Sequence, residues 1–437
     1  MTHSDPRGNP VDTRAAAAVA ATETALWRMM SFYGVPIDDL AAAQAADPAW
    51  ALPPLMHAGF LLSLTEPSVL PEAAQILARA EPLVARSAPR EQAHCAALKQ
   101  VQRGDWAGAC ATWEALLLRH PRDALALQWA HLFDFHRGDA INLRQRVARV
   151  LPEWDEHDPL HPYVLGQYAF GLEECNRYVQ AEETGRRALA GAAKVPWAIH
   201  AVAHVMEMQG RYDEGAAWMS QWHDDWAIGN GFVGHLGWHH ALFAIEALDH
   251  ATALQRFDAH LKADPVQITL QRLDAAALLW RLHLLGVDVG SRWIELERGW
   301  IDAEHGAGHY PFNDLHALLA IVGRGDLARA RAWLTLIESR VDAHPAMREV
   351  GLPLMRGMLA YAHGDHDDAL RTLYPLRAIA HRFGGSHAQR DLIDQTLLAA
   401  ACGASERAIG RALLNERRLA KPETPLTAHW AARLARH

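Results

Sequence analysis

The stretch Asn176-Arg-Tyr-Val-Gln-Ala181-Glu-Glu-Thr-Gly-Arg-Arg-Ala188-Leu189 contains a short turn and then an amphipathic pattern, with alanine where two helices would approach each other. A turn of the same kind starts at Gly210, 34 residues after Asn176. A period of 34 residues is typical of tetratricopeptide repeats, in which each repeat is a helical hairpin. Turns of this kind start at Gly104, Gly138, Asn176, Gly210, Gly325 and Gly364.

The repeat is irregular, because 39 residues separate Gly325 from Gly364. No segment alternates apolar and polar residues as a half-buried strand would. The sequence therefore predicts an all-α protein, an irregular tetratricopeptide-like α-solenoid of antiparallel helix pairs with a central concave pocket. Three segments are expected: an N-terminal helical cap in residues 1–90, the repeats that carry the functional site in residues 91–412, and a closing segment in residues 413–437.

The composition indicates a folded protein that does not bind nucleic acid. Half of the 437 residues are apolar, and the formal net charge is -9. No group of lysines and arginines is dense enough to follow a phosphate backbone. The N-terminus lacks the order of a secretory signal, and no apolar run approaches the roughly 18 residues that would span a bilayer. We expect a cytoplasmic protein without membrane contact, which could form a homo-oligomer.

Histidines recur at helical spacing in the centre of the chain. His200, His204 and Glu207 lie at i, i+4 and i+7, and His235 and His239 repeat the i, i+4 spacing. Residues at these spacings share one face of a helix. Facing helices that project histidine and glutamate inward often hold a metal, so the four histidines are predicted ligands of Fe, Mn or Zn, or of a haem. The alternative is a set of core histidines bonded to backbone carbonyls and to Glu207.

Other residues are candidates for catalysis or substrate binding. Glu207 is a candidate general base, since burial would raise its pKa. Asp314 and His316 are further catalytic candidates, although Asp314 could equally cap the helix that it starts. The candidate substrate-binding residues are His161, Glu174, Trp238, His387 and Arg390. Packing between repeats is the alternative role for these side chains, and helix capping is the alternative at Arg390.

Four strings in the chain resemble a known family. They are Tyr168-Ala-Phe-Gly-Leu-Glu-Glu174, His200-Ala-Val-Ala-His-Val-Met-Glu207, Asn313-Asp-Leu-His316 and Gly384-Gly-Ser-His387. They are similar to the StaR-like family, also known as the tetratricopeptide repeat protein 38 family, and the resemblance extends from about Trp27 to Leu419. It implies a tetratricopeptide-like helical fold, and the activities proposed for the family include oxidative tailoring of aromatic side chains.

Two functions from different classes follow from these observations. The first is a metal- or haem-dependent enzyme, an oxidoreductase or secondly a hydrolase, that acts on a small aromatic or carboxylate-bearing substrate in a histidine-rich pocket. The alternative is a non-catalytic tetratricopeptide scaffold that binds a peptide or protein partner. The density of histidine and tryptophan favours the enzyme, because peptide grooves in such repeats more often present lysine and asparagine.

Overall fold

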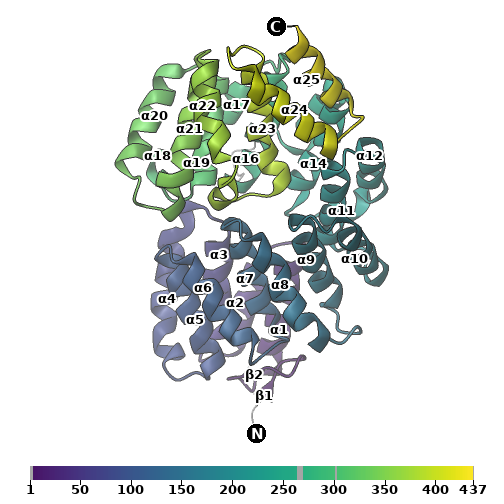
Figure 1. Cartoon of the computed structure of the whole chain (residues 1–437). Coiled ribbons are helices and arrows are strands. Elements are labelled where there is room, and N and C mark those ends of the chain that lie inside the picture. The colour runs from purple at the N-terminus through teal and green to yellow at the C-terminus, as the bar shows by residue number, and fades with distance from the viewer. Residues whose placement is uncertain (1–2, 263–268, 301–302, 437) are drawn as a thin grey trace. The chain divides into compact units, whose positions relative to one another are not determined.

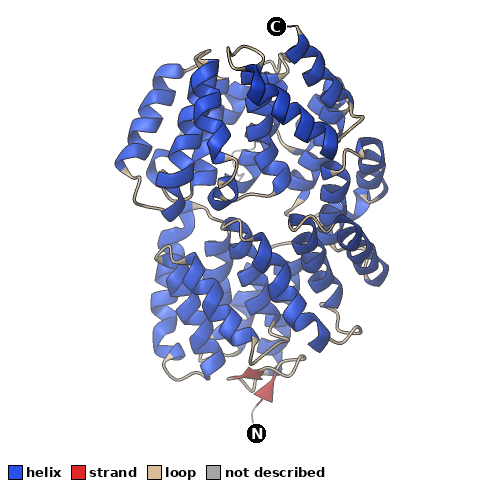
Figure 2. Ribbon diagram, in the orientation of Figure 1, coloured by secondary structure: helices blue, strands red, loops and turns tan. Residues whose placement is uncertain are grey.

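The computed structural model describes residues 3–262, 269–300 and 303–436, and its regular structure is almost entirely helical (Figure 2). The named strands of the described chain are β1 (His3–Ser4) and β2 (Pro10–Val11), which pair antiparallel. The predicted all-α, tetratricopeptide-like fold is confirmed, whereas the central concave pocket stays a prediction. None of the described helices is long and apolar enough to span a bilayer.

The chain divides into two compact units, and the first comprises Met1–Val202 and Asp224–Phe232. Its helices run from α1 to the beginning of α11 (Figure 1). They are α1 (Ala16–Ser31), α2 (Ile37–Ala46), α3 (Leu52–Ser63), α4 (Leu70–Val84), α5 (Pro89–Gln102), α6 (Trp106–Leu117), α7 (Ala124–His136), α8 (Ala140–Val150), α9 (His161–Glu174), α10 (Tyr178–Gly191), the first part of α11 (Pro196–Met208) and most of α13 (His223–Trp226). Single 3₁₀ turns, η1 (Pro67–Val69) and η2 (Leu151–Glu153), precede α4 and follow α8.

The second unit comprises Ala203–His223 and Val233–His437, so α11 begins in one unit and ends in the other. Its further helices are α12 (Tyr212–Gln221), α14 (Val233–Glu246), α15 (His250–His260), α16 (Thr269–Leu284), α17 (Arg292–Arg298), α18 (Ala303–Gly306), α19 (Pro311–Gly323), α20 (Leu327–Ser339), α21 (Leu352–Ala362), α22 (His366–Leu376), α23 (His387–Ala401), α24 (Arg407–Ala420) and α25 (Pro425–Ala435). A π-helical turn, η3 (Met347–Gly351), leads into α21, and a 3₁₀ turn, η4 (Ala380–Phe383), follows α22. The division into a cap, a repeat region and a closing segment stays a prediction.

The repeated turns have a common construction that explains why the sequence pattern predicts the hairpins. Gly138 has a φ of 64°, which ends α7, and the N–H of Asp139 donates to the carbonyl of Asp134 at 2.8 Å. The Asp139 side chain then accepts from the N–H of Asn142 and caps α8. The same arrangement recurs at Gly104-Asp105, Gly325-Asp326 and Gly364-Asp365. Each glycine therefore stops one helix in the left-handed region, and each aspartate starts the next.

Tryptophans fill the core of each unit. In the first unit, the rings of Trp113 on α6 and Trp129 on α7 lie 5.7 Å apart, and both are fully buried. In the second unit, the indole N–H of Trp280 on α16 donates to Thr396 on α23 at 2.9 Å. Trp280 thus joins helices that are distant in sequence and keeps its indole N–H bonded.

Candidate functional site

Four residues of the predicted histidine stripe belong to the second unit. His204 and Glu207 lie on the last turns of α11, and His235 and His239 lie on α14. His204 and His239 have no exposed surface, and Glu207 is 6% exposed. Both helices are apolar around these positions, so burial of the stripe follows from the same pattern that buries its neighbours.

The three imidazoles of this unit contact one another. The ring centroids of His204 and His239 lie 4.4 Å apart, and those of His239 and His235 lie 4.8 Å apart. One nitrogen from each ring falls within 4.8 Å of one nitrogen of each of the others. We call His204, His235 and His239 the histidine cluster.

Two carboxylates orient the histidine cluster. His239 Nδ1 lies 3.1 Å from Oε2 of Glu207, and His235 Nδ1 lies 2.8 Å from Oδ2 of Asp274 on α16. A carboxylate opposite Nδ1 favours the tautomer with the proton on that nitrogen, which leaves the lone pair on Nε2. This is the form in which imidazole binds a metal.

The support for the cluster extends to α23. Asp274 Oδ1 accepts from Nε2 of Gln389 at 3.3 Å. The other amide atom of Gln389, Oε1, accepts from the N–H of Ser386, and the two residues form the capping box of α23. The orientation of His235 is therefore fixed by helices α16 and α23 together.

Burial shifts the pKa values of Glu207 and His239. Desolvation raises the pKa of the Glu207 carboxyl, although nearby Lys421 and His204 oppose the rise. Desolvation and the neighbouring imidazoles of His204 and His235 hold the pKa of His239 well below its usual value. His239 is consequently a neutral donor to Glu207 at physiological pH.

Trp238 closes one side of the cluster. Its ring centroid lies 4.7 Å from that of His239 and 5.4 Å from that of His235. The guanidinium of Arg281 lies over the indole, 5.4 Å from the ring centroid. Trp238, predicted to bind substrate, is fully buried here as a wall of the cluster.

His200 was predicted to be a fourth ligand, and it lies one turn before His204 on α11. The first unit ends at Val202, between these two histidines. Within that unit the His200 ring packs against aromatic side chains of Phe170, Trp197 and Phe232, with centroid distances of 5.0, 5.1 and 5.1 Å. Its role as a ligand stays a prediction.

The predicted catalytic residues Asp314 and His316 both lie on α19 and are buried. Asp314 accepts from the N–H of Gly308 at 3.2 Å, and burial raises its pKa to about 8. Its side chain therefore binds the preceding loop and does not cap the helix, which starts at Pro311. His316 Nδ1 donates to the carbonyl of Phe312 at 2.7 Å, and burial lowers its pKa to about 4.

Of the predicted substrate-binding residues, His161 and Glu174 belong to the first unit, whereas Trp238, His387 and Arg390 belong to the second. His387 and Arg390 line a cavity of about 600 Å³ in the second unit, and none of the cluster histidines contributes to its wall. Two other charged residues of this wall, Arg377 and Asp394, are already paired with each other at 2.6 Å. His161 and Glu174 are the first and last residues of α9 in the first unit, so about 20 Å of helix separates them.

An apolar groove of about 330 Å³ lies between helices α2, α3 and α4 of the first unit. Its wall is formed by Ile37, Leu40, Ala41, Gln44, Pro53, Pro54, His57, Ile76, Arg79, Ala80 and Leu83. Arg79 is exposed and has no ion pair with any other described residue. Nothing in the sequence singles this groove out, because its residues come from three helices and their apolar side chains resemble those of any core.

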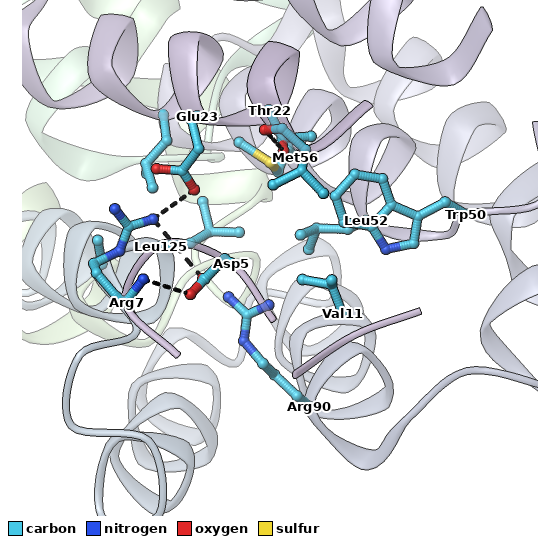
Figure 3. Close-up of a pocket in the computed structure, with 13 residues that line it drawn as sticks. Asp5, Arg7, Val11, Thr22, Glu23, Trp50, Leu52, Met56, Arg90 and Leu125 are labelled. Carbon is cyan, nitrogen blue, oxygen red and sulfur yellow. Dashed lines mark hydrogen bonds and ion pairs between the residues drawn. The ribbon is translucent and has the colours of Figure 1, made fainter. Parts of the chain in front are cut away.

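A second cavity of the first unit is too small for a ligand (Figure 3). Its volume is about 20 Å³, which is enough for one water molecule. Charged side chains line it. The Arg7 guanidinium donates to Glu23 at 2.6 Å, and the backbone N–H of Arg7 donates to the Asp5 carboxylate at 2.9 Å. Figure 3 shows these groups beside Arg90, and they anchor the N-terminal segment.

The chain was compared with known proteins. No family model matches it, so the StaR-like resemblance is not confirmed. Among solved structures, it is similar to a tetratricopeptide repeat protein from Parabacteroides merdae, with 15% identity, 65% of this chain and 98% of that chain covered, and a TM-score of 0.36. It is also similar to human IFIT1, solved as a dimer with PPP-AAAA (14% identity, 84% and 86% covered, TM-score 0.40). Yeast Tom70 is a further match (11% identity, 83% and 90% covered, TM-score 0.37).

The comparisons contradict the main functional prediction. The three similar structures are those of a tetratricopeptide repeat protein, IFIT1 and Tom70. The predicted metal- or haem-dependent enzyme is therefore wrong, and so is its small-molecule substrate. The non-catalytic scaffold, the alternative reading, is favoured instead.

Sequence reasoning missed the partners of the histidine cluster. Asp274 and Gln389 hold His235 in place, yet they lie 39 and 154 residues from it. One signal was available for Asp274, since it directly precedes the apolar run Ala275–Trp280. An acidic residue beside such a run is buried only with a partner.

Proposed function

We propose that this chain is a scaffold of the tetratricopeptide type, related to the StaR-like proteins, which binds a peptide segment of a partner protein in the groove between α2, α3 and α4. The expected segment is apolar and carries an acidic side chain. The observation that supports the proposal is the lining of the groove, which is mostly aliphatic and has Arg79 as its one charged side chain.

The aliphatic wall favours an apolar segment. Ile37, Pro54 and Leu83 come from three different helices, are partly exposed, and face the same groove. Covering them removes apolar surface from water, which is the main driving force of association. A volume of about 330 Å³ suits a few side chains of a peptide, at the lower end of the range for ligand pockets.

The charge in the groove favours an acidic residue in the partner. Partial burial and the nearby Arg79 guanidinium lower the pKa of His57, so the imidazole is neutral at physiological pH. Arg79 therefore supplies the positive charge, and an incoming carboxylate can pair with it in bidentate geometry. A chain of net charge -9 with one arginine at the groove is a poor match for a nucleic acid.

The test is a selection followed by a binding measurement. Short peptides displayed on phage are selected against the full-length protein, and the best binder is synthesised with a fluorescent label. Its dissociation constant is then measured by anisotropy for the wild type and for Ala41→Trp, which fills the groove. We expect Ala41→Trp to weaken binding by about tenfold or more, and Arg79→Glu to weaken it in a salt-dependent manner.

Two exposed residues outside the groove provide matched controls. Ala42→Trp adds the same side chain to α2, and Arg86→Glu makes the same charge reversal just after α4. Both variants should bind the peptide as the wild type does. The proposal fails if the selected peptides bind Ala41→Trp unchanged, if they lack acidic residues, or if a single-stranded RNA displaces them.

A further inference from the structure

The histidine cluster brings three imidazoles from two helices into contact inside the second unit. His204 and His239 are fully buried, and His235 is mostly buried, with 12% of its side chain exposed. A buried imidazole is stable only where its polar nitrogens are bonded, whether to a side chain, to the backbone or to a metal ion. Packing alone would be better served by leucine or phenylalanine at these positions. Another factor must therefore favour three histidines in one place.

Two carboxylates hold the rings of the histidine cluster. Glu207 faces Nδ1 of His239, and Asp274 faces Nδ1 of His235. This relay of carboxylate, histidine and metal is the usual outer sphere of zinc sites, where it fixes the ring and makes Nε2 a better ligand. The first two members of the relay are present twice in this cluster.

The charged side chains around the cluster include one more carboxylate than cation. The buried polar network around the cluster contains four carboxylates and three cationic side chains. The carboxylates are Glu207, Glu246, Asp274 and Asp391, and the cations are Arg281, Arg417 and Lys421. Arg417 and Glu246 pair with each other at 2.6 Å, which leaves three carboxylates and two cationic side chains in this network. A divalent cation there would be attracted by these carboxylates.

We propose that His204, His235 and His239 bind one divalent transition-metal ion, with Zn²⁺ as the best match, as a structural site that joins α11 to α14. Three nitrogen ligands at about 2.0–2.1 Å are typical of zinc. Ligand atoms of a tetrahedral zinc lie about 3.4 Å apart, so modest ring rotations from the present separation of up to 4.8 Å are enough. The bound ion would stabilise the second unit because the unfolded chain lacks the site.

The decisive measurement needs no variant. Full-length protein without a histidine tag is freed of metal by dialysis against a chelator, and Zn²⁺ is titrated in competition with a chromophoric chelator. We expect one equivalent to bind with a dissociation constant below about 1 μM and to raise the melting temperature. Absence of binding by a folded wild-type protein, judged by circular dichroism, would overturn the proposal.

Variants identify the ligands. His204→Asn, His235→Asn and His239→Asn should each lower the affinity for Zn²⁺ at least a hundredfold. The matched control is His240→Asn, because His240 follows His239 on α14, is buried, and lies on another side of the helix, 3.4 Å from Ser220. Unchanged affinity in His239→Asn, or equal losses in His240→Asn, would show that the ion binds elsewhere. Cobalt(II) absorption of the loaded wild type, lost in folded His239→Asn, is an independent readout of the same site.

Discussion

The Nδ1 atom of His235 lies 2.8 Å from Oδ2 of Asp274, and this contact joins α14 to α16 inside the second unit. The carboxylate also accepts from Gln389, so its position is set from a third helix, α23. Because Asp274 is itself held by Gln389, it restrains the His235 ring more firmly than an unsupported carboxylate would. Asp274 is therefore a positioning residue for the histidine cluster.

Replacing Asp274 by asparagine should weaken metal binding without removing a ligand. Outer-sphere partners of metal-bound histidines typically contribute a factor of about 10–100 in affinity. We expect Asp274→Asn to raise the dissociation constant for Zn²⁺ by that factor in the chelator competition. Asp288→Asn, an exposed aspartate just after α16, is the control and should bind as the wild type does. Equal affinity in Asp274→Asn and wild type would remove Asp274 from this role.

The first unit contains a buried ion pair whose loss should be costly. Arg90 Nε donates to Oδ2 of Asp123 at 2.7 Å, and both side chains are almost fully buried. Removing one partner of such a pair leaves an uncompensated buried charge and costs about 3–5 kcal/mol. We expect Arg90→Met to lower the free energy of unfolding by this amount in urea titrations. The exposed pair of Arg348 and Asp342 is the reference, and Arg348→Met should cost at most about 1 kcal/mol.

The turns of the fold could be predicted from sequence because their chemistry is local. Gly138 and Asp139 end one helix and cap the next with bonds that stay within a few residues. The start of the first helix was less predictable. Helix α1 starts at Ala16 without a side-chain cap, and the nearby Thr13 Oγ1 donates to Asp47 at 2.5 Å. A bond to a residue 34 positions away cannot be read from the local pattern.

The candidate site shows the same limit. The sequence predicted His204, His235 and His239 as ligands of one metal, and the structure places one nitrogen of each ring within 4.8 Å of the others. Asp314 and His316 were catalytic candidates from the sequence, and the structure shows their side chains bonded to Gly308 and to Phe312 of the same segment. Spacing along one helix indicates a shared face, but only the packing of several helices determines which face meets which.

Gly171 should be intolerant of any side chain. It lies on α9 where that helix crosses α8, and a Cβ at this position would come within 2.6 Å of the backbone of Leu143. Backbone cannot rotate away as a side chain can, so Gly171→Ala should cost about 1–3 kcal/mol of unfolding free energy. Gly234→Ala is the control, since the nearest atom to its added Cβ is 3.7 Å away. That variant should be neutral or slightly stabilising, because alanine favours a helix more than glycine does.

Asp314 should make the stability of the second unit depend on pH. Burial raises its pKa to about 8, although the N–H of Gly308 and the charge of Arg340 oppose the rise. The unfolded chain has the ordinary pKa of about 3.9, so between about pH 4 and pH 8 the folded state holds a proton that the unfolded state has lost. The contribution to stability is therefore complete below about pH 4 and is lost as the pH rises through 8.

The variant Asp314→Asn tests this sign. Its amide oxygen can still accept from Gly308, and it has no proton to lose. We expect the melting temperature of Asp314→Asn to match that of the wild type near pH 4 and to exceed it by about 2 °C or more near pH 8.5, as measured by differential scanning fluorimetry. Glu304→Gln, which changes an exposed carboxyl on the preceding short helix α18, should shift the curve little. If Asp314→Asn were less stable than the wild type by the same margin at both pH values, the carboxyl would be ionised in the folded protein.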